Sequence, residues 1–163
     1  MNERIPERIF LVSADGNGAG KTTRAKQLSP VVLSFADAVR RECQTLYSES
    51  KVDWFDKTQE GKLQLVMPGK TVRDCLIEHG QKACEDDQFH WAKAMVLAIL
   101  SSHARIVAVD DLRKLTELNY LTDIFGPLIT HEHIIFDDAV LEPQYNNNEL
   151  RACATRLILR RSP

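Results

Sequence analysis

A short run of glycines, followed by a lysine and two threonines, lies near the beginning of the chain. Glycines leave backbone N–H groups uncovered by side chains, so several of these groups can converge on phosphate oxygens. A lysine directly after such a loop reaches the outer phosphates of a nucleotide, and the next hydroxyl binds magnesium. The loop comprises Asp15, Gly16, Asn17, Gly18, Ala19, Gly20, Lys21, Thr22 and Thr23. The sequence therefore predicts a binding site for ATP and Mg²⁺.

The side chains of this loop have different expected roles. Lys21 is expected to bind the β- and γ-phosphates, Thr22 to bind magnesium and Thr23 to contact the α-phosphate. The pattern G-x-x-x-x-G-K-[ST] has a glycine where this chain has Asp15, and Gly16 comes one residue late. Asp15 therefore either alters the start of the loop or faces the acceptor of the phosphate.

Two acidic residues follow a buried strand that is expected over residues 106–109. Asp110 and Asp111 occupy the place of a Walker B carboxylate, and we expect one of them to hold magnesium, directly or through water. Asp111 alternatively caps the following helix. Arg113 comes just after this strand, where ligands of open α/β sheets collect. Its planar guanidinium group suits a phosphate.

Further polar residues are candidates for binding the acceptor. Arg73, on the first turn of a helix, offers a second guanidinium for phosphate. Asp37 is a useful base if the acceptor is a hydroxyl, and otherwise an ordinary carboxylate at a helix N-terminus. Arg40 and Arg41 contact an acceptor phosphate or lie on a solvated face. Trp91 stacks on a base or packs in the core. The catalytic candidates are Lys21, Asp37, Arg73 and Arg113. The candidates for substrate binding are Asp37, Arg40, Arg41, Arg73, Trp91, Asp111 and Arg113.

Two histidines, His131 and His133, flank Glu132 and lie on the same face of an expected strand. A pair of imidazoles is compatible with a metal site, but such a site needs further ligands, and the sequence offers no third one here. We therefore interpret the two histidines as packing residues of the strand.

The elements expected around these residues alternate between strands and helices. Strands are expected over residues 9–12, 31–34, 106–109 and 133–136, and helices over residues 21–28, 36–46, 71–79, 86–102, 112–125 and 149–159. Thr71 is expected to cap the third helix and Gly80 to end it. Residues 48–69 are expected to form an irregular, mobile loop. The alternation predicts an α/β fold with three layers, in which helices flank a mostly parallel sheet.

Length and composition restrict the class of protein further. The chain has 163 residues, of which 44% are hydrophobic and 27% charged, and its net charge is −2. These values predict one globular domain over residues 1–163, with a mobile lid or acceptor segment at residues 48–90. The near-neutral charge argues against bulk electrostatic binding of nucleic acid. No apolar run reaches the roughly 20 residues of a transmembrane helix, so we expect a cytoplasmic protein without membrane contact.

Three segments beyond the glycine-rich loop add a resemblance. They are residues 34–41, with an alanine–aspartate step, residues 71–80, with threonine-x-arginine and a glycine, and residues 109–113, which are followed by Glu117. Together with the loop they resemble bacteriophage deoxynucleoside monophosphate kinases and their P-loop kinase relatives. The resemblance implies a P-loop kinase fold, ATP and Mg²⁺ as cofactors, and transfer of the γ-phosphate to a deoxynucleoside monophosphate. The family often has an arginine soon after the glycine that corresponds to Gly80, whereas this chain has Lys82 there.

Two other functions stay open at this point. Related kinases phosphorylate a hydroxyl on a modified pyrimidine, such as 5-hydroxymethyluracil in phage DNA, so DNA is an alternative acceptor. Asp15 or Asp37 as a base and a basic terminal helix favour this alternative, and the net charge opposes it. The third function is a regulatory ATPase that binds nucleotide and has no acceptor. If the chain comes from a phage, the expected location is the cytoplasm of the host cell; a homodimer is also left open.

Overall fold

The chain is arranged as two compact units. A computed structural model describes residues 4–16, 19–136 and 147–160. The first unit comprises Met1–Phe35 and Ala92–Pro163, and the second unit comprises Ala36–Trp91. Within the described part of the chain, no helix is both long and apolar enough to cross a membrane.

The first unit is built on a five-stranded parallel sheet. Its strands are β1 (Arg8–Ala14), β2 (Val32–Leu33), β5 (Ile106–Val109), β6 (Ile129–Phe136) and β7 (Arg156–Arg160). Their spatial order is β2-β5-β1-β6-β7, and all four neighbouring pairs are parallel. The predicted α/β class and the parallel sheet are therefore confirmed.

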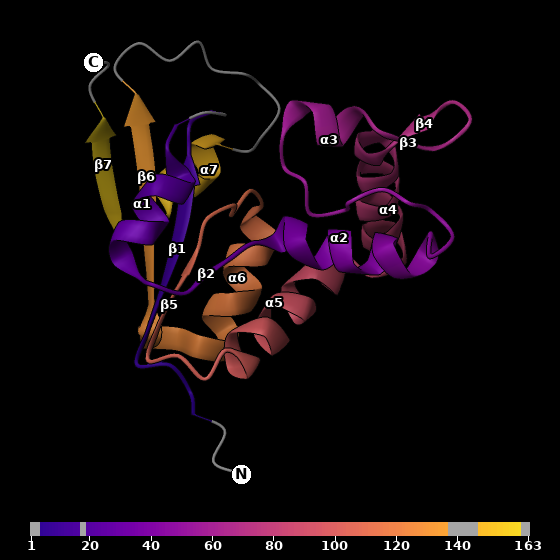
Figure 1. Ribbon diagram of the computed structural model, residues 1–163. Helices are drawn as coiled ribbons and strands as arrows, with labels where there is room; N and C mark the ends of the chain where they lie inside the picture. Colours follow the sequence, from indigo (N-terminus) through magenta and orange to yellow (C-terminus); the bar gives the residue numbers. More distant parts are fainter. Residues whose placement is uncertain (1–3, 17–18, 137–146, 161–163) are drawn as a thin grey trace. The chain divides into compact units, whose positions relative to one another are not determined.

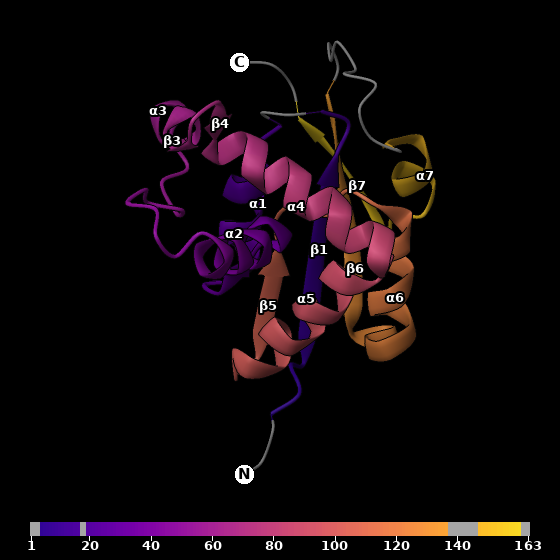
Figure 2. The ribbon, with the colours of Figure 1, turned by 90° about the vertical axis from the view of Figure 1, so that its right-hand side faces the viewer.

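Helices cover both faces of this sheet (Figures 1 and 2). They are α1 (Lys21–Leu28), α5 (His90–Ser101), α6 (Leu115–Phe125) and α7 (Asn147–Ala152), with the short 3₁₀ helix η1 (Gly126–Leu128) after α6. Phe10 and Val12 of β1 pack with Ala25 of α1 in one buried cluster. Because side chains alternate along a strand, Leu11 and Ser13 face the opposite side, toward α6 and α7. Coverage of both faces explains why β1 reads as a nearly continuous apolar run.

The second unit combines helices with a small hairpin. Its elements are α2 (Phe35–Leu46), α3 (Gln59–Leu63), β3 (Leu65–Met67), β4 (Lys70–Thr71) and α4 (Val72–Asp86), and β3 pairs antiparallel with β4. Cys43 of α2 and Cys75 of α4 are buried together with Trp54 and Val72. Residues 48–69, predicted to be irregular, therefore contain a short helix and a strand.

The beginning of α4 confirms one local prediction, and its end corrects another. The Thr71 hydroxyl accepts a hydrogen bond from Asp74 N at 3.2 Å, and the Asp74 carboxylate accepts one from Thr71 N at 2.9 Å, which is a capping box. Gly80 does not end the helix, which continues to Asp86. An isolated glycine costs a helix only about 1 kcal/mol, and tertiary packing overrides that cost.

The helix predicted over residues 149–159 is wrong. Helix α7 ends at Ala152, and residues 156–160 form β7, which pairs with β6 from Glu132 to Phe136. The apolar residues between Arg156 and Arg160 are too few for their spacing to distinguish a strand from a helical turn. Ile158 packs on the cluster beneath α1, which favours the strand.

Candidate functional site

The glycine-rich loop joins the carboxyl end of β1 to the N-terminus of α1. Asn17 and Gly18, two of its predicted phosphate-binding residues, lie outside the described residues. Gly20 has φ of 81°, a left-handed conformation that a residue with a Cβ adopts only with strain. No side chain caps the helix, and its first turn holds no acidic residue. The first N–H groups of α1 therefore offer hydrogen bonds and the positive end of the helix dipole to an anion.

Thr22 and Asp110 form a direct contact beside this helix end. The Thr22 hydroxyl donates a hydrogen bond to Asp110 Oδ2 at 2.8 Å. Asp110 follows β5, which lies next to β1 in the sheet, so the topology brings together residues 88 positions apart. Hydroxyl and carboxylate oxygens are hard donors of the kind that Mg²⁺ prefers, and the two residues fit the predicted ion. Within the described ranges, no group of three or more His, Cys, Asp or Glu residues is placed to hold a metal by itself.

Lys21 shares its surroundings with other predicted site residues. Burial lowers its pKa, and the positive charge of Arg113 lowers it further. The carboxylates of Asp111 and Asp110 oppose this shift. The first unit therefore places Lys21, Thr22, Asp110, Asp111 and Arg113 within one electrostatic neighbourhood.

Asp111 has a structural role in the first unit. Its Oδ2 accepts a hydrogen bond from the Ser34 hydroxyl at 2.7 Å, and its Oδ1 accepts one from Phe35 N, also at 2.7 Å. Both oxygens thus anchor the junction after β2, and Asp111 does not cap the helix that follows it. Because these contacts occupy both oxygens of Asp111, Asp110 is the better candidate for binding magnesium. The prediction that Asp111 binds magnesium or substrate is therefore not supported.

Glu117 fixes the backbone that carries Arg113. Its Oε2 accepts hydrogen bonds from Arg113 N at 3.3 Å and Lys114 N at 3.1 Å at the start of α6. Burial raises the pKa of Glu117 to about 7, and the nearby charge of Asp111 adds to the effect. Burial therefore favours the protonated form of this carboxyl group.

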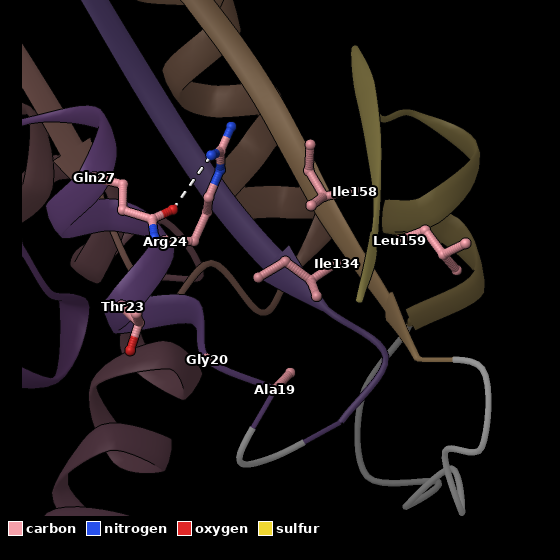
Figure 3. A pocket seen from close by; sticks show the side chains of 8 residues that line it. All are labelled: Ala19, Gly20, Thr23, Arg24, Gln27, Ile134, Ile158 and Leu159. Carbon is pink, nitrogen blue, oxygen red and sulfur yellow. Dashed lines mark hydrogen bonds between the residues drawn. The ribbon is translucent and has the colours of Figure 1, made fainter. Parts of the chain in front are cut away.

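A pocket of about 270 Å³ lies beside the loop and α1 (Figure 3). It is lined by Ala19, Gly20, Thr23, Arg24, Gln27, Ile134, Ile158 and Leu159. Gly20 and Thr23 make one part of it polar, and Ile134 and Ile158 make another part apolar. Its volume lies just below the 300–1,000 Å³ usual for pockets that enclose a drug-sized ligand.

A partly buried ion pair that the sequence analysis missed ties α1 to the sheet. The guanidinium of Arg24 donates from Nε to Glu132 Oε2 at 2.8 Å and from Nη2 to Oε1 at 3.1 Å. The Glu132 side chain is fully buried, and Arg156 Nη1 lies 3.7 Å from Oε1. Strand alternation was the available signal, because it places Glu132 on the face opposite the two flanking histidines.

Asp15 points into the interior of the first unit. It is 4% exposed, and its Oδ1 accepts a hydrogen bond from His133 Nε2 at 2.7 Å. A residue in this position does not face an acceptor, so the prediction of Asp15 as a base is not supported. Gly16 is half-buried, and Thr23, predicted to contact the α-phosphate, is exposed.

Two predicted substrate residues of the second unit are corrected by their burial. Arg40 is 5% exposed and donates from Nη1 to the Trp54 carbonyl at 2.6 Å. Trp91 is 5% exposed, and its Nε1 donates to the Gly80 carbonyl at 3.0 Å. Both side chains stabilise the second unit, and neither is open to a nucleotide.

The other three predicted residues of the second unit remain accessible. Arg41 and Arg73 are exposed, on α2 and at the start of α4 respectively. Asp37 is half-buried and forms an ion pair with Lys57, Nζ to Oδ1 at 2.9 Å. Two guanidinium groups in this unit therefore stay available for an anion, whereas the Asp37 carboxylate already has a cationic partner.

Comparison with models of known protein families gives no match for the chain, and comparison with curated proteins gives none either.

Proposed function

We propose that the protein is a P-loop kinase that transfers the γ-phosphate of ATP to a deoxynucleoside monophosphate, with Mg²⁺ as cofactor. The observation that carries the proposal is the hydrogen bond between Thr22 and Asp110 at the N-terminus of α1. In phosphate loops, the residue after the lysine and a carboxylate at the end of a neighbouring strand are the protein's magnesium partners. The 2.8 Å contact brings that pair together behind a left-handed Gly20 and beside Lys21.

The donor side of the reaction uses residues of the first unit. Lys21 and Arg113 supply positive charge for the phosphates, and the N–H groups of α1 bind the oxygens between them. Thr22 and Asp110 would hold Mg²⁺, which when bound neutralises the charge on the β- and γ-phosphates. The pocket next to Gly20 and Thr23 would take the remainder of the donor nucleotide (Figure 3).

The acceptor is best explained as a phosphate. A phosphate acceptor is already a nucleophilic anion and needs no base, only cations that hold it in place. Asp15 is buried against His133 and Asp37 is paired with Lys57, so neither resembles a free base. The exposed guanidinium groups of Arg41 and Arg73 suit an acceptor phosphate. The basic terminal helix that favoured DNA as acceptor ends at Ala152, and residues 156–160 form a strand, so this argument for DNA no longer holds.

Transfer of labelled γ-phosphate tests the proposal. Purified protein is incubated with ATP and Mg²⁺ and offered the four common deoxynucleoside monophosphates, ordinary DNA or DNA containing 5-hydroxymethyluracil. We expect label on at least one monophosphate and none on DNA. Label only on modified DNA would replace the proposed acceptor, and ATP hydrolysis without any acceptor would identify a regulatory ATPase.

A pair of variants assigns the activity to the loop. Lys21→Met is expected to lower phosphate transfer at least about a hundredfold, because it removes a charge that stabilises the transferred group. Lys26→Met removes an exposed lysine from the same helix and is the matched control. Equal activity of the two variants would exclude the loop as the reaction centre.

A further inference from the structure

Four buried polar side chains form a hydrogen-bonded chain at the start of the glycine-rich loop. The Ser13 hydroxyl lies 2.6 Å from His131 Nε2 and 2.7 Å from His133 Nδ1. His133 Nε2 lies 2.7 Å from Asp15 Oδ1, and Arg151 Nη1 of α7 lies 3.9 Å from Asp15 Oδ2. Ser13 and His133 are fully buried, and His131 is 1% exposed. Polar groups buried this deeply are stable only when they are paired, so the arrangement has strict geometry.

The hydrogen-bonding chemistry of Asp15 and His133 determines the position of one proton in this series of side chains. An ionised carboxylate only accepts hydrogen bonds, so His133 Nε2 must carry the hydrogen that it shares with Asp15. Ser13 has a single hydroxyl hydrogen, which it gives to one histidine while it accepts from the other. In either direction, His133 still donates to Asp15. The contact between β6 and the loop is therefore kept whichever way the Ser13 hydrogen points.

The main chain reinforces the same connection. Asp15 N donates to the Ile134 carbonyl at 3.1 Å, which extends the pairing of β1 with β6 to the first residue of the loop. Asp15 is thus tied to β6 by both its backbone and its side chain, and to α7 through Arg151. Its negative charge faces His133 and Arg151, the charged or titratable groups that β6 and α7 present to it.

We infer that Asp15 is a positioning residue that sets the backbone of the phosphate-binding loop through its contact with His133. This role accounts for an aspartate at the position where the common pattern has a glycine. The side chain leaves the loop on its interior side, so it occupies no space that a phosphate needs. The inference rests on the proposed binding of ATP by this loop and adds a determinant of its affinity.

Two substitutions separate positioning from the effect of charge. Asp15→Asn removes the charge but keeps an oxygen that accepts from His133, whereas Asp15→Ala removes the contact. Glu7→Gln is the control, because Glu7 is an exposed acid near the opposite end of β1, paired with Arg105. The dissociation constant of MgATP is measured by calorimetry. Amide hydrogen exchange of a peptide covering residues 13–24 is measured without nucleotide.

We expect Asp15→Ala to weaken MgATP binding about tenfold and to speed exchange in this peptide. Asp15→Asn and Glu7→Gln should stay within about twofold of the unchanged protein in both measurements. If Asp15→Ala does not fold, Asp15→Ser, which is too short to reach His133, replaces it with the same expectation. If Asp15→Asn and Asp15→Ala weaken MgATP binding equally, the charge of Asp15 matters and not its contact with His133. If Asp15→Ala binds MgATP as tightly as the unchanged protein, Asp15 has no role in binding. Either result overturns the inference.

The two measurements also separate this inference from the proposed function. If the unchanged protein does not bind MgATP, the proposed function fails, and hydrogen exchange alone decides the role of Asp15. If it binds MgATP and exchange is the same for Asp15→Ala as for the unchanged protein, the positioning role fails while the kinase proposal stands.

Discussion

Replacing Glu117 by glutamine tests how a buried carboxyl group near Arg113 responds to pH. The amide oxygen of glutamine still accepts from the N–H groups of Arg113 and Lys114, so the start of α6 keeps its hydrogen bonds. The amide has no charge at any pH. The substitution therefore removes a titration and leaves the packing nearly unchanged.

The size of the effect follows from the pKa of Glu117, which burial raises from 4.5 to about 7. Between these values the folded protein keeps a proton that the unfolded chain has lost, so stability falls as pH rises through this window. One pKa unit corresponds to about 1.4 kcal/mol. The free energy of unfolding should thus lose about 3 kcal/mol between pH 4.5 and 7 because of Glu117.

His131 acts in the opposite direction over much of the same range. Burial lowers its pKa from 6.5 to about 4, and the charge of His133 adds to this shift. Between pH 4 and 6.5 the unfolded chain binds a proton that the folded protein does not, so stability rises with pH by about 3 kcal/mol. The two effects nearly cancel in the unchanged protein. In Glu117→Gln the effect of His131 remains alone, and stability should rise by about 3 kcal/mol from pH 4 to 6.5.

Urea unfolding followed by circular dichroism at several pH values measures this difference. Tryptophan fluorescence is less suitable, because Trp54 and Trp91 both belong to the second unit and Glu117 belongs to the first. Asp123→Asn, an exposed acid-to-amide change on the same helix, is the control and should leave the pH profile unchanged. Parallel profiles for Glu117→Gln and the unchanged protein would refute the assignment of a raised pKa to Glu117.

Three further substitutions test other features. Thr71→Ala removes the capping box of α4 and should lower the free energy of unfolding by about 1 kcal/mol, measured by urea unfolding with tryptophan fluorescence. Arg24→Met leaves the buried Glu132 with the more distant Arg156 as its cationic partner among the described residues, and should cost about 2 kcal/mol in the same titration read by circular dichroism; an unchanged midpoint would contradict the ion pair's role. Asp110→Asn should remove most of the magnesium dependence of ATP binding, measured by calorimetry with and without Mg²⁺, and full retention would exclude Asp110 as a ligand.

Local signals predicted the elements around the loop well. The helix over residues 21–28 has the predicted bounds, and the strand over residues 106–109 does too. Both are bounded by residues with a strong local preference, such as Gly20 before the helix and the acidic pair after the strand. The Thr71 cap was also predictable, because capping depends only on residues three positions apart.

The errors concern features that depend on distant contacts. The segment of β7 is held by pairing with β6 and by the packing of Ile158, neither of which the local sequence encodes. The polar chain from Ser13 to Asp15 joins residues about 120 positions apart, as does the pairing of β1 with β6. Burial of Arg40 and Trp91 likewise depends on the packing of the second unit, so their exposure could not be read from their positions in the sequence.

The position of β1 in the sheet has a consequence for how the protein is made. Among the strands of its sheet β1 comes first in the sequence, but both of its neighbours come much later: Ile9 pairs with Val107 on one side and with Ile129 on the other. At about 5–20 residues per second, translation leaves this apolar strand with two open edges for roughly 10 s. Open apolar edges are templates for aggregation. Until β5 and β6 can pair with β1, the nascent chain therefore depends on slow release from the ribosome, on chaperones or on rapid burial of β1 by α1 to avoid aggregation.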